Sequence, residues 1–115
     1  MIKATFYIQN SEFKGFALRG HANTADHGKD ILCAAVSSLT NMAISTAIKV
    51  FEVPCDYIVM ETEACVNFKI SAEEHRNLYA VRGLIEGMYL TLKEYEAQYP
   101  KNINVSKKML KEKQK

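Results

Sequence analysis

One long stretch with almost no charge constrains this chain more than any other feature. From Ile31 to Phe51 the only charged residue is Lys49, and Asp30 and Pro54 bound the stretch. Aspartate is a preferred helix N-cap, and proline cannot continue a helix. The sequence therefore predicts a helix that begins just after Asp30, ends near Phe51 and packs against its neighbours on several faces.

Alternating apolar and polar residues on both sides of this helix predict two β-hairpins. The alternation over residues 2–8 is followed by turn residues 10–12 and by a second strand over 13–19, in which Gly15 either weakens the strand or marks a bulge. Residues 57–60 and 64–70 form the second predicted pair. Each short connection makes its pair antiparallel.

A second helix is predicted after the second hairpin. Ser71 and Glu74 match a capping box, and an amphipathic stripe runs from Leu78 to Tyr99. Gly83 and Gly87 lie one turn apart inside it, where each costs about 1 kcal/mol relative to alanine. Close approach of the small-residue side of the first helix would explain both glycines; that side carries Ala34, Ser38 and Ser45.

These elements predict an α+β domain over residues 1–106. We expect an antiparallel sheet of four or five strands with two main helices, in the order β-β-α-β-β-α. Residues 102–106 are expected to form a short edge strand, and 107–115 a basic, disordered tail.

Composition favours a reduced, cytoplasmic protein. The 115 residues include three cysteines, an odd number without a Cys-Xaa-Xaa-Cys pair, which argues against a disulfide framework and a zinc ribbon. The N-terminus alternates rather than forming a signal peptide, and six Ser, Thr and Asn residues interrupt the best candidate membrane span, 31–48. Residues 1–100 carry a net charge of −3 and residues 101–115 a net charge of +5, so the body itself does not predict a nucleic-acid surface.

Cys33 is the strongest candidate for chemistry. It falls in the first turn of the predicted helix, where unpaired N–H groups and the helix dipole favour a thiolate. His21 precedes the same loop and could act as its base. The alternative is a structural cysteine, since Cys33 is flanked by apolar residues and buried cysteine behaves as a small hydrophobe. The Asp30 carboxylate could cap the helix, orient His21 or oppose a thiolate.

The remaining titratable residues are weaker candidates. Cys55 and Cys65 stand at no helix start, His75 is expected on the solvated surface, and His27 is the rival to His21 as base. A metal site made of His21, His27 and Cys33 matches no strong zinc spacing, so no metal or cofactor is expected. Residues 23–29 lack a large apolar side chain and are expected to form a mobile loop, either a lid or a passive connector.

The residues around this loop match a known signature, which comprises Gly20, His21, Ala22, Gly28 and the run Asp30–Ser37. The chain therefore resembles the Prp family of bacterial ribosomal-processing cysteine proteases over about residues 1–100. The resemblance implies that His21 and Cys33 are the catalytic pair, with supporting roles for Asp30 and Ser37 and for the two signature glycines.

The same resemblance implies a substrate and an assembly. Members of the family remove an N-terminal extension from ribosomal protein twenty-seven of the large subunit, after a hydrophobic, Phe-rich motif, and they are dimers. The competing hypothesis is a non-catalytic ribosome-associated module that binds RNA or protein through its basic tail. That tail has no arginine and no aromatic residue, which weakens specific RNA recognition.

Overall fold

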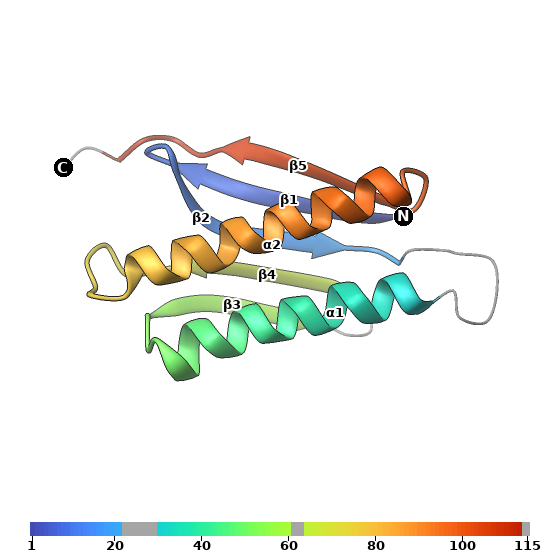
Figure 1. The fold of residues 1–115 in the computed structure, drawn as a ribbon. Helices are drawn as coiled ribbons and strands as arrows, with labels where there is room; N and C mark the ends of the chain where they lie inside the picture. Colours follow the sequence, from blue (N-terminus) through green and yellow to red (C-terminus); the bar gives the residue numbers. More distant parts are fainter. Residues whose placement is uncertain (22–29, 61–63, 114–115) are drawn as a thin grey trace.

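The structure is a computed structural model that describes residues 1–21, 30–60 and 64–113. Its elements follow in the order β1 (Ile2–Gln9), β2 (Glu12–Arg19), α1 (Asp30–Ser45), η1 (Thr46–Val50), β3 (Cys55–Met60), β4 (Cys65–Ile70), α2 (Leu78–Gln98) and β5 (Ile103–Met109) (Figure 1). The prediction of an α+β fold with two main helices is confirmed.

Both predicted hairpins are present. Asn10 and Ser11 have positive φ angles of 53° and 65°, as a tight hairpin turn requires. The register of β1 with β2 shifts beside Gly15, in agreement with the bulge that was one of the two predictions for this glycine. A Cβ at Gly15 would collide with the carbonyl oxygen of Phe68 on β4. The glycine is therefore needed where two backbones approach closely.

The strands form one mixed sheet in the order β3-β4-β2-β1-β5. β5 runs parallel to β1, so the prediction of a purely antiparallel sheet is wrong at this edge. The connection through α2 carries the chain back to the starting end of the sheet, which makes the parallel direction possible. β5 continues to Met109, so the prediction of a disordered tail over residues 107–115 is wrong for residues 107–109.

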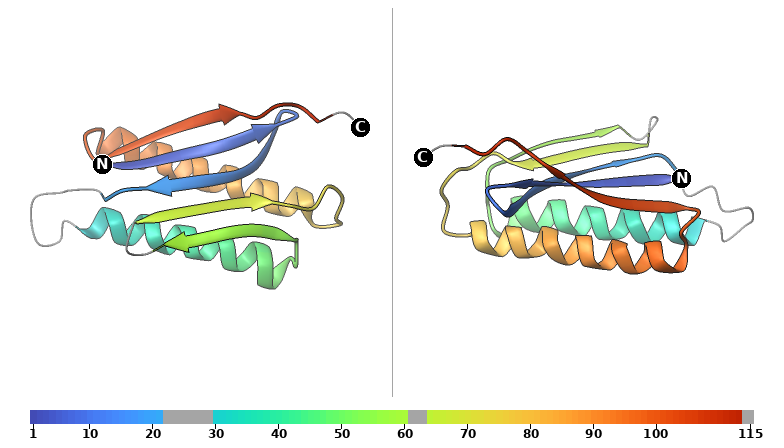
Figure 2. Two further views of the ribbon diagram at one scale, coloured as in Figure 1. Left: turned by 180° about the vertical axis from the view of Figure 1, so that it is seen from behind. Right: turned by 90° about the horizontal axis from the view of Figure 1, so that it is seen from above.

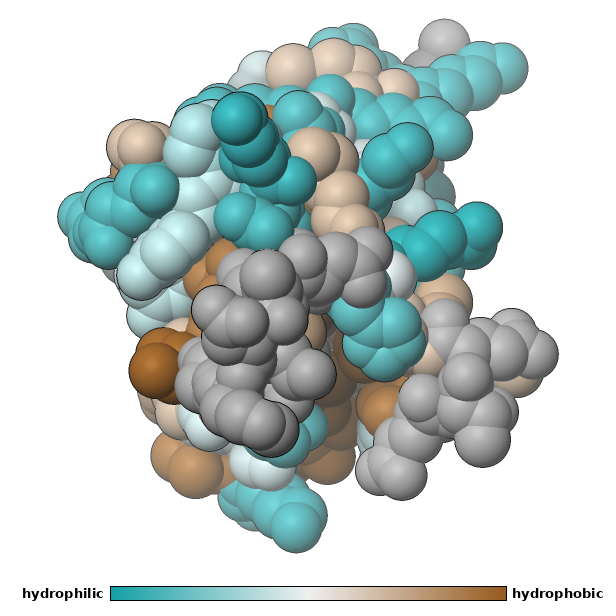
Figure 3. Space-filling model, turned by 90° about the vertical axis from the view of Figure 1, so that its right-hand side faces the viewer, coloured by the Kyte–Doolittle hydropathy of each residue, from teal (hydrophilic) through white to brown (hydrophobic). Residues whose placement is uncertain are grey.

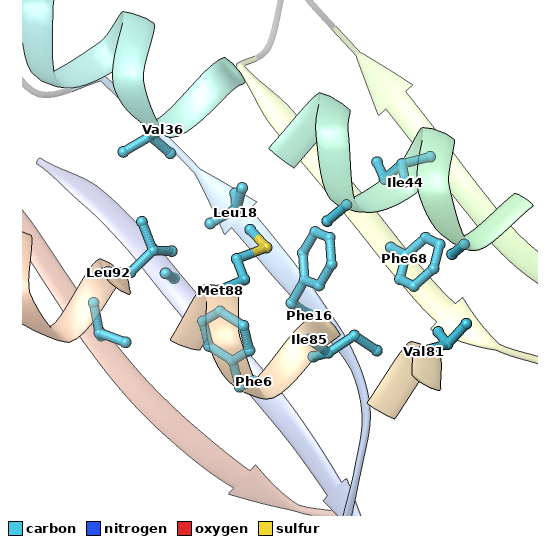
Figure 4. Close-up of a cluster of buried hydrophobic side chains, with 14 of the residues drawn as sticks. Phe6, Phe16, Leu18, Val36, Ile44, Phe68, Val81, Ile85, Met88 and Leu92 are labelled. Atoms are coloured by element: carbon cyan, nitrogen blue, oxygen red, sulfur yellow. The ribbon is translucent and has the colours of Figure 1, made fainter. Parts of the chain in front are cut away.

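Both helices cover the same face of the sheet, and the core lies between the two layers (Figure 2). Aromatic rings from three neighbouring strands fill its centre: Phe6, Phe16 and Phe68 are each at most 1% exposed, and the rings of Phe16 and Phe68 stack 5.1 Å apart (Figure 4). Val81, Ile85, Met88 and Leu92 of α2 pack against them from the other layer.

The first helix starts and ends where the sequence predicts, and its last turn is π-helical, with the Phe51 N–H donating to the Thr46 carbonyl at 3.0 Å. It is buried on one side only, because Ile31 and Val50 are 72% and 66% exposed. The prediction of packing on several faces is therefore wrong. By length and composition Ile31–Val50 is apolar enough to cross a membrane, but its sheet-facing side forms part of the core.

The predicted start of the second helix is wrong by six residues, since the N-cap is Asn77 and not Ser71. The N–H groups of Ser71 and Ala72 donate to the Pro54 carbonyl, which extends the β3–β4 pairing instead of opening a helix. α2 begins after Asn77, whose side chain donates to the Phe51 carbonyl at 2.8 Å. A long-range anchor therefore overrides the local capping pattern.

The two helix glycines do not mark a close contact within the chain. A Cβ at Gly83 or at Gly87 would have no heavy atom within 4 Å, and Ala34, Ser38 and Ser45 are exposed. The predicted glycine contact between the helices is wrong for this chain.

Candidate active site

Gly20 fixes the backbone that presents His21. It follows β2 with φ at +92°, and its N–H donates to the Ala64 carbonyl at 2.9 Å. A Cβ at this position would also collide with the Met1 carbonyl oxygen. Only glycine satisfies both conditions, so the exposed His21 leaves the sheet in a direction set by its predecessor.

Cys33 lies in the first turn of α1, at the same end of the sheet. It is partly buried and packs against the core, while Ser37, one turn later, is exposed. Cys33 therefore has features of both hypotheses, the structural cysteine and the nucleophile: its side chain contacts hydrophobic neighbours and also lines a surface cavity.

His21 and Cys33 line one cavity of about 370 Å³. Its walls come from the ends of β1, β2, β3 and β4 and from the start of α1; the apolar part comprises Ile2, Leu18, Val36, Val59, Met60 and Val66. Figure 3 looks onto this end of the molecule and shows hydrophobic atoms within its recess. The cavity thus combines a thiol, an imidazole and an apolar lining.

Several lining residues could not be predicted from local patterns. Thr40 and Asn41 extend the helix side beyond Ser37, and Val59 and Met60 come from the edge strand β3. Thr40 is buried, and its hydroxyl donates to the Val36 carbonyl at 2.7 Å. In the sequence, residues 57–60 predicted only a strand, and the place of this strand beside Cys33 depends on the sheet register.

The other two thiols differ from Cys33 in their surroundings. Burial, and after it the charge of Asp56, raises the pKa of the Cys55 thiol to about 11, so it stays protonated at neutral pH. Cys55 is the first residue of β3, and Cys65 also lines the cavity that contains Cys33. The three cysteines, all among the described residues, form no disulfide.

A larger cavity, of about 1030 Å³, lies at the opposite end of the sheet. It contains His75, whose Nδ1 accepts the Asn77 N–H at 3.0 Å, but no cysteine, serine or threonine among its described lining. Arg82 and Lys113 there are paired with Glu12 and Glu73. This cavity therefore lacks a nucleophile of the kind that the first cavity provides.

Some predictions fall outside the described residues. These are the loop 23–29 with His27 and Gly28, and the side chain of Asp30. Among the residues that are described, no group of His, Cys, Asp or Glu is arranged to hold a metal ion.

The backbone of Gly20 gives a direct prediction for stability. Gly20→Ala is expected to lower the free energy of unfolding by about 1–3 kcal/mol, because alanine is strained at this φ and has no room beside Met1. Urea denaturation measures the difference. Gly83→Ala is the matched control: it adds the same methyl group in open space within a helix and is expected to stabilise. Equal effects of the two substitutions would contradict the argument.

Comparisons with known proteins point in one direction. The family model described as cysteine protease Prp matches residues 1–104. The ribosomal processing cysteine protease Prp of Bacillus subtilis is 34% identical over 111 residues, which cover 92% of this chain and 96% of that protein.

Solved structures share the fold. SMU.848 from Streptococcus mutans matches with a TM-score of 0.83 at 22% identity and covers 96% of both chains. The essential ribosomal processing protease Prp from S. aureus, in complex with a covalently linked product peptide, matches with a TM-score of 0.81 at 18% identity, over 94% of this chain and 100% of that one. A second S. aureus structure holds a substrate peptide.

Proposed function

We infer the function from the family, because the chain belongs to the Prp family of cysteine proteases. We propose that it is an endopeptidase with Cys33 as nucleophile and His21 as base. In this proposal it acts in the cytoplasm on the precursor of ribosomal protein twenty-seven and removes the N-terminal extension after a Phe-rich motif. The observation that carries the proposal is the single cavity lined by both His21 and Cys33.

The chemistry follows from these two side chains. His21 takes the proton of the Cys33 thiol, and the thiolate sulfur attacks the carbonyl carbon of the scissile peptide. The C–N bond then breaks, and the leaving amine receives that proton from His21. Water, deprotonated by the same imidazole, attacks the resulting thioester, which releases the acid and restores the thiol. The covalently linked product peptide in the S. aureus relative supports an acyl-enzyme route.

The start of α1 offers stabilisation for charge that develops during the reaction. Backbone N–H groups in the first helical turn lack partners within the helix and lie at its positive end. A tetrahedral oxyanion formed at Cys33 would therefore develop beside suitable donors. Ser37, one turn later on the cavity wall, is proposed to support the site through its hydroxyl.

The apolar walls support a hydrophobic substrate. Ile2, Leu18 and Val36 are buried at the base of the cavity, and Val59 and Met60 line it from β3 while remaining 47% and 40% exposed. A large aromatic side chain placed there would remove this surface from water, which favours binding by roughly 25 cal/mol per Å² of apolar area. A Phe-rich motif fits this lining.

The outer side of α1 supports a homodimer. Between Ile31 and Ile48 no residue is charged, and Ile31, Met42 and Val50 are 72%, 46% and 66% exposed. We propose that a second copy covers this side. Sedimentation analysis of the full chain is expected to give twice the monomer mass, and a monomer at micromolar concentration would contradict the dimer.

The experiment that tests the function is cleavage of the full-length ribosomal precursor. Incubation with the protein is expected to give two products, whose masses place the cut after the Phe-rich motif. An intact precursor, or a cut that the Cys33→Ala variant also makes, would reject the proposed activity.

A further inference from the structure

No other layer formed by the described residues covers the face of the sheet opposite the helices, and the left view of Figure 2 looks onto it. The burial pattern assigns side chains to it, because Ile2, Ala4, Phe6 and Ile8 of β1 point into the core. The register then fixes the neighbours across the five strands. We call this surface the open face; its members include Lys3, Thr5, Tyr7, Gly15, Ala17, Arg19, Asp56, Ile58, Asn67, Lys69, Asn104, Ser106 and Lys108.

The charges on the open face are strongly unbalanced. Four cationic side chains lie on it, Lys3, Arg19, Lys69 and Lys108. Among the described residues the register places two acidic side chains there, Asp56 and Glu12, and Glu12 is paired with Arg82 of α2. Residues 1–100 as a whole carry a net charge of −3. The average over the sequence therefore conceals a positive surface.

Among the described residues, Lys69 has an acidic residue directly across the strands, Asp56, whereas Lys3, Arg19 and Lys108 have none. Lys3 stands directly opposite Arg19, and like charges in such cross-strand pairs destabilise a sheet. The three ion pairs found among residues 1–21, 30–60 and 64–113 all involve other side chains. An anionic partner would relieve this repulsion.

The centre of the open face is uncharged and can form hydrogen bonds. The middle row across the sheet is Ser106, Thr5, Ala17, Asn67 and Ile58, all uncharged. On the same face, toward the β1–β2 turn, the Lys69 Nζ lies 4.6 Å from the ring centroid of Tyr7, so a cation lies over an aromatic ring. Hydroxyl and amide groups between two cationic ends suit a sugar–phosphate backbone.

We propose that the open face binds RNA through its phosphate backbone, independently of the peptidase activity. A second copy of this face would be repelled by its own positive charge. The exposed apolar side chains on the face, Ile58 and Met60, are confined to the edge strand β3, which leaves the other strands without an apolar group that could insert into a membrane. Binding through few charges without base contacts is weak, salt-dependent and not sequence-specific.

The test is fluorescence anisotropy of a short, labelled single-stranded RNA titrated with the full chain carrying Cys33→Ala. With about three net positive charges engaged, the dissociation constant is expected to rise roughly ten- to twentyfold between about 50 and about 200 mM salt. The double variant Lys3→Glu, Lys108→Glu, made in the same background, is expected to weaken binding at the lower salt concentration by roughly tenfold or more, because it replaces attraction at two exposed positions by repulsion.

The matched control is Lys49→Glu with Arg76→Glu, which changes the net charge equally but lies on the helix side of the molecule. It is expected to bind RNA within about threefold of its parent, since the open face is intact. Equal losses in both double variants would show that only net charge matters and would overturn the proposal. So would unchanged binding after Lys3→Glu, Lys108→Glu, or a partner that proves to be an acidic protein with no RNA binding. Cleavage of a short peptide, measured separately, reports on the protease alone.

Discussion

Cys33→Ala is expected to yield a folded protein that has lost at least about a thousandfold of its cleavage rate, because the nucleophile is gone while the substrate cavity remains. Cys33→Ser is expected to be similarly inactive, since a hydroxyl is much less acidic than a thiol. Product masses after incubation with the precursor give the rate, and denaturation checks the fold.

The other cysteines provide the controls for this experiment. Cys65→Ser is the sharper one, because Cys65 lines the same cavity, and Cys55→Ser removes a thiol whose pKa of about 11 keeps it protonated. Both variants are expected to retain cleavage. Parental activity in Cys33→Ala, or its loss only in Cys65→Ser, would contradict the assignment of the nucleophile.

His21→Ala is expected to lower the cleavage rate by about a hundred- to ten-thousandfold, the range for loss of a general base. Its exposed side chain makes large changes in stability unexpected. Added imidazole is expected to restore part of the rate, which a merely structural role would not produce.

His27→Ala is the matched control for the base. It is expected to retain most activity, because His21 shares the cavity with Cys33. Strong loss in His27→Ala together with an active His21→Ala would transfer the role of base to His27.

The elements that were predictable from the sequence depend on local patterns. The alternation in residues 2–8 and the N-cap residue Asp30 before an uncharged run mark β1 and the start of α1, since these signals act within a few residues. Cys33 and His21 could be selected because a helix start and a strand end are local features. Their meeting in one cavity needed the β-hairpin and α1 to pack together.

The predictions that failed depend on distant partners. Ser71 matches a capping box, yet its N–H bonds to Pro54, because pairing across the sheet satisfies the backbone better than a new helix would. β5 was predictable as an edge strand, but its parallel direction follows from the crossover through α2. Val59 and Met60 of the cavity wall, like the charge segregation on the open face, exist only once the strand register is formed.

The pairing of β1 with β5 has a consequence for how the chain acquires its fold during synthesis. Ile2 lies beside Ile103, and the Ile2 N–H donates to the Asn102 carbonyl at 2.8 Å, so β1 finds one neighbour only after residues 102–109 have been synthesised. Until then β1 exposes a free edge on the side away from β2, and closing so long a loop is slow relative to local hairpin formation. Ile2 also lines the cavity with Cys33. A nascent chain is therefore expected to hold Cys33 in an incomplete cavity and to complete that cavity only when β5 has emerged from the ribosome.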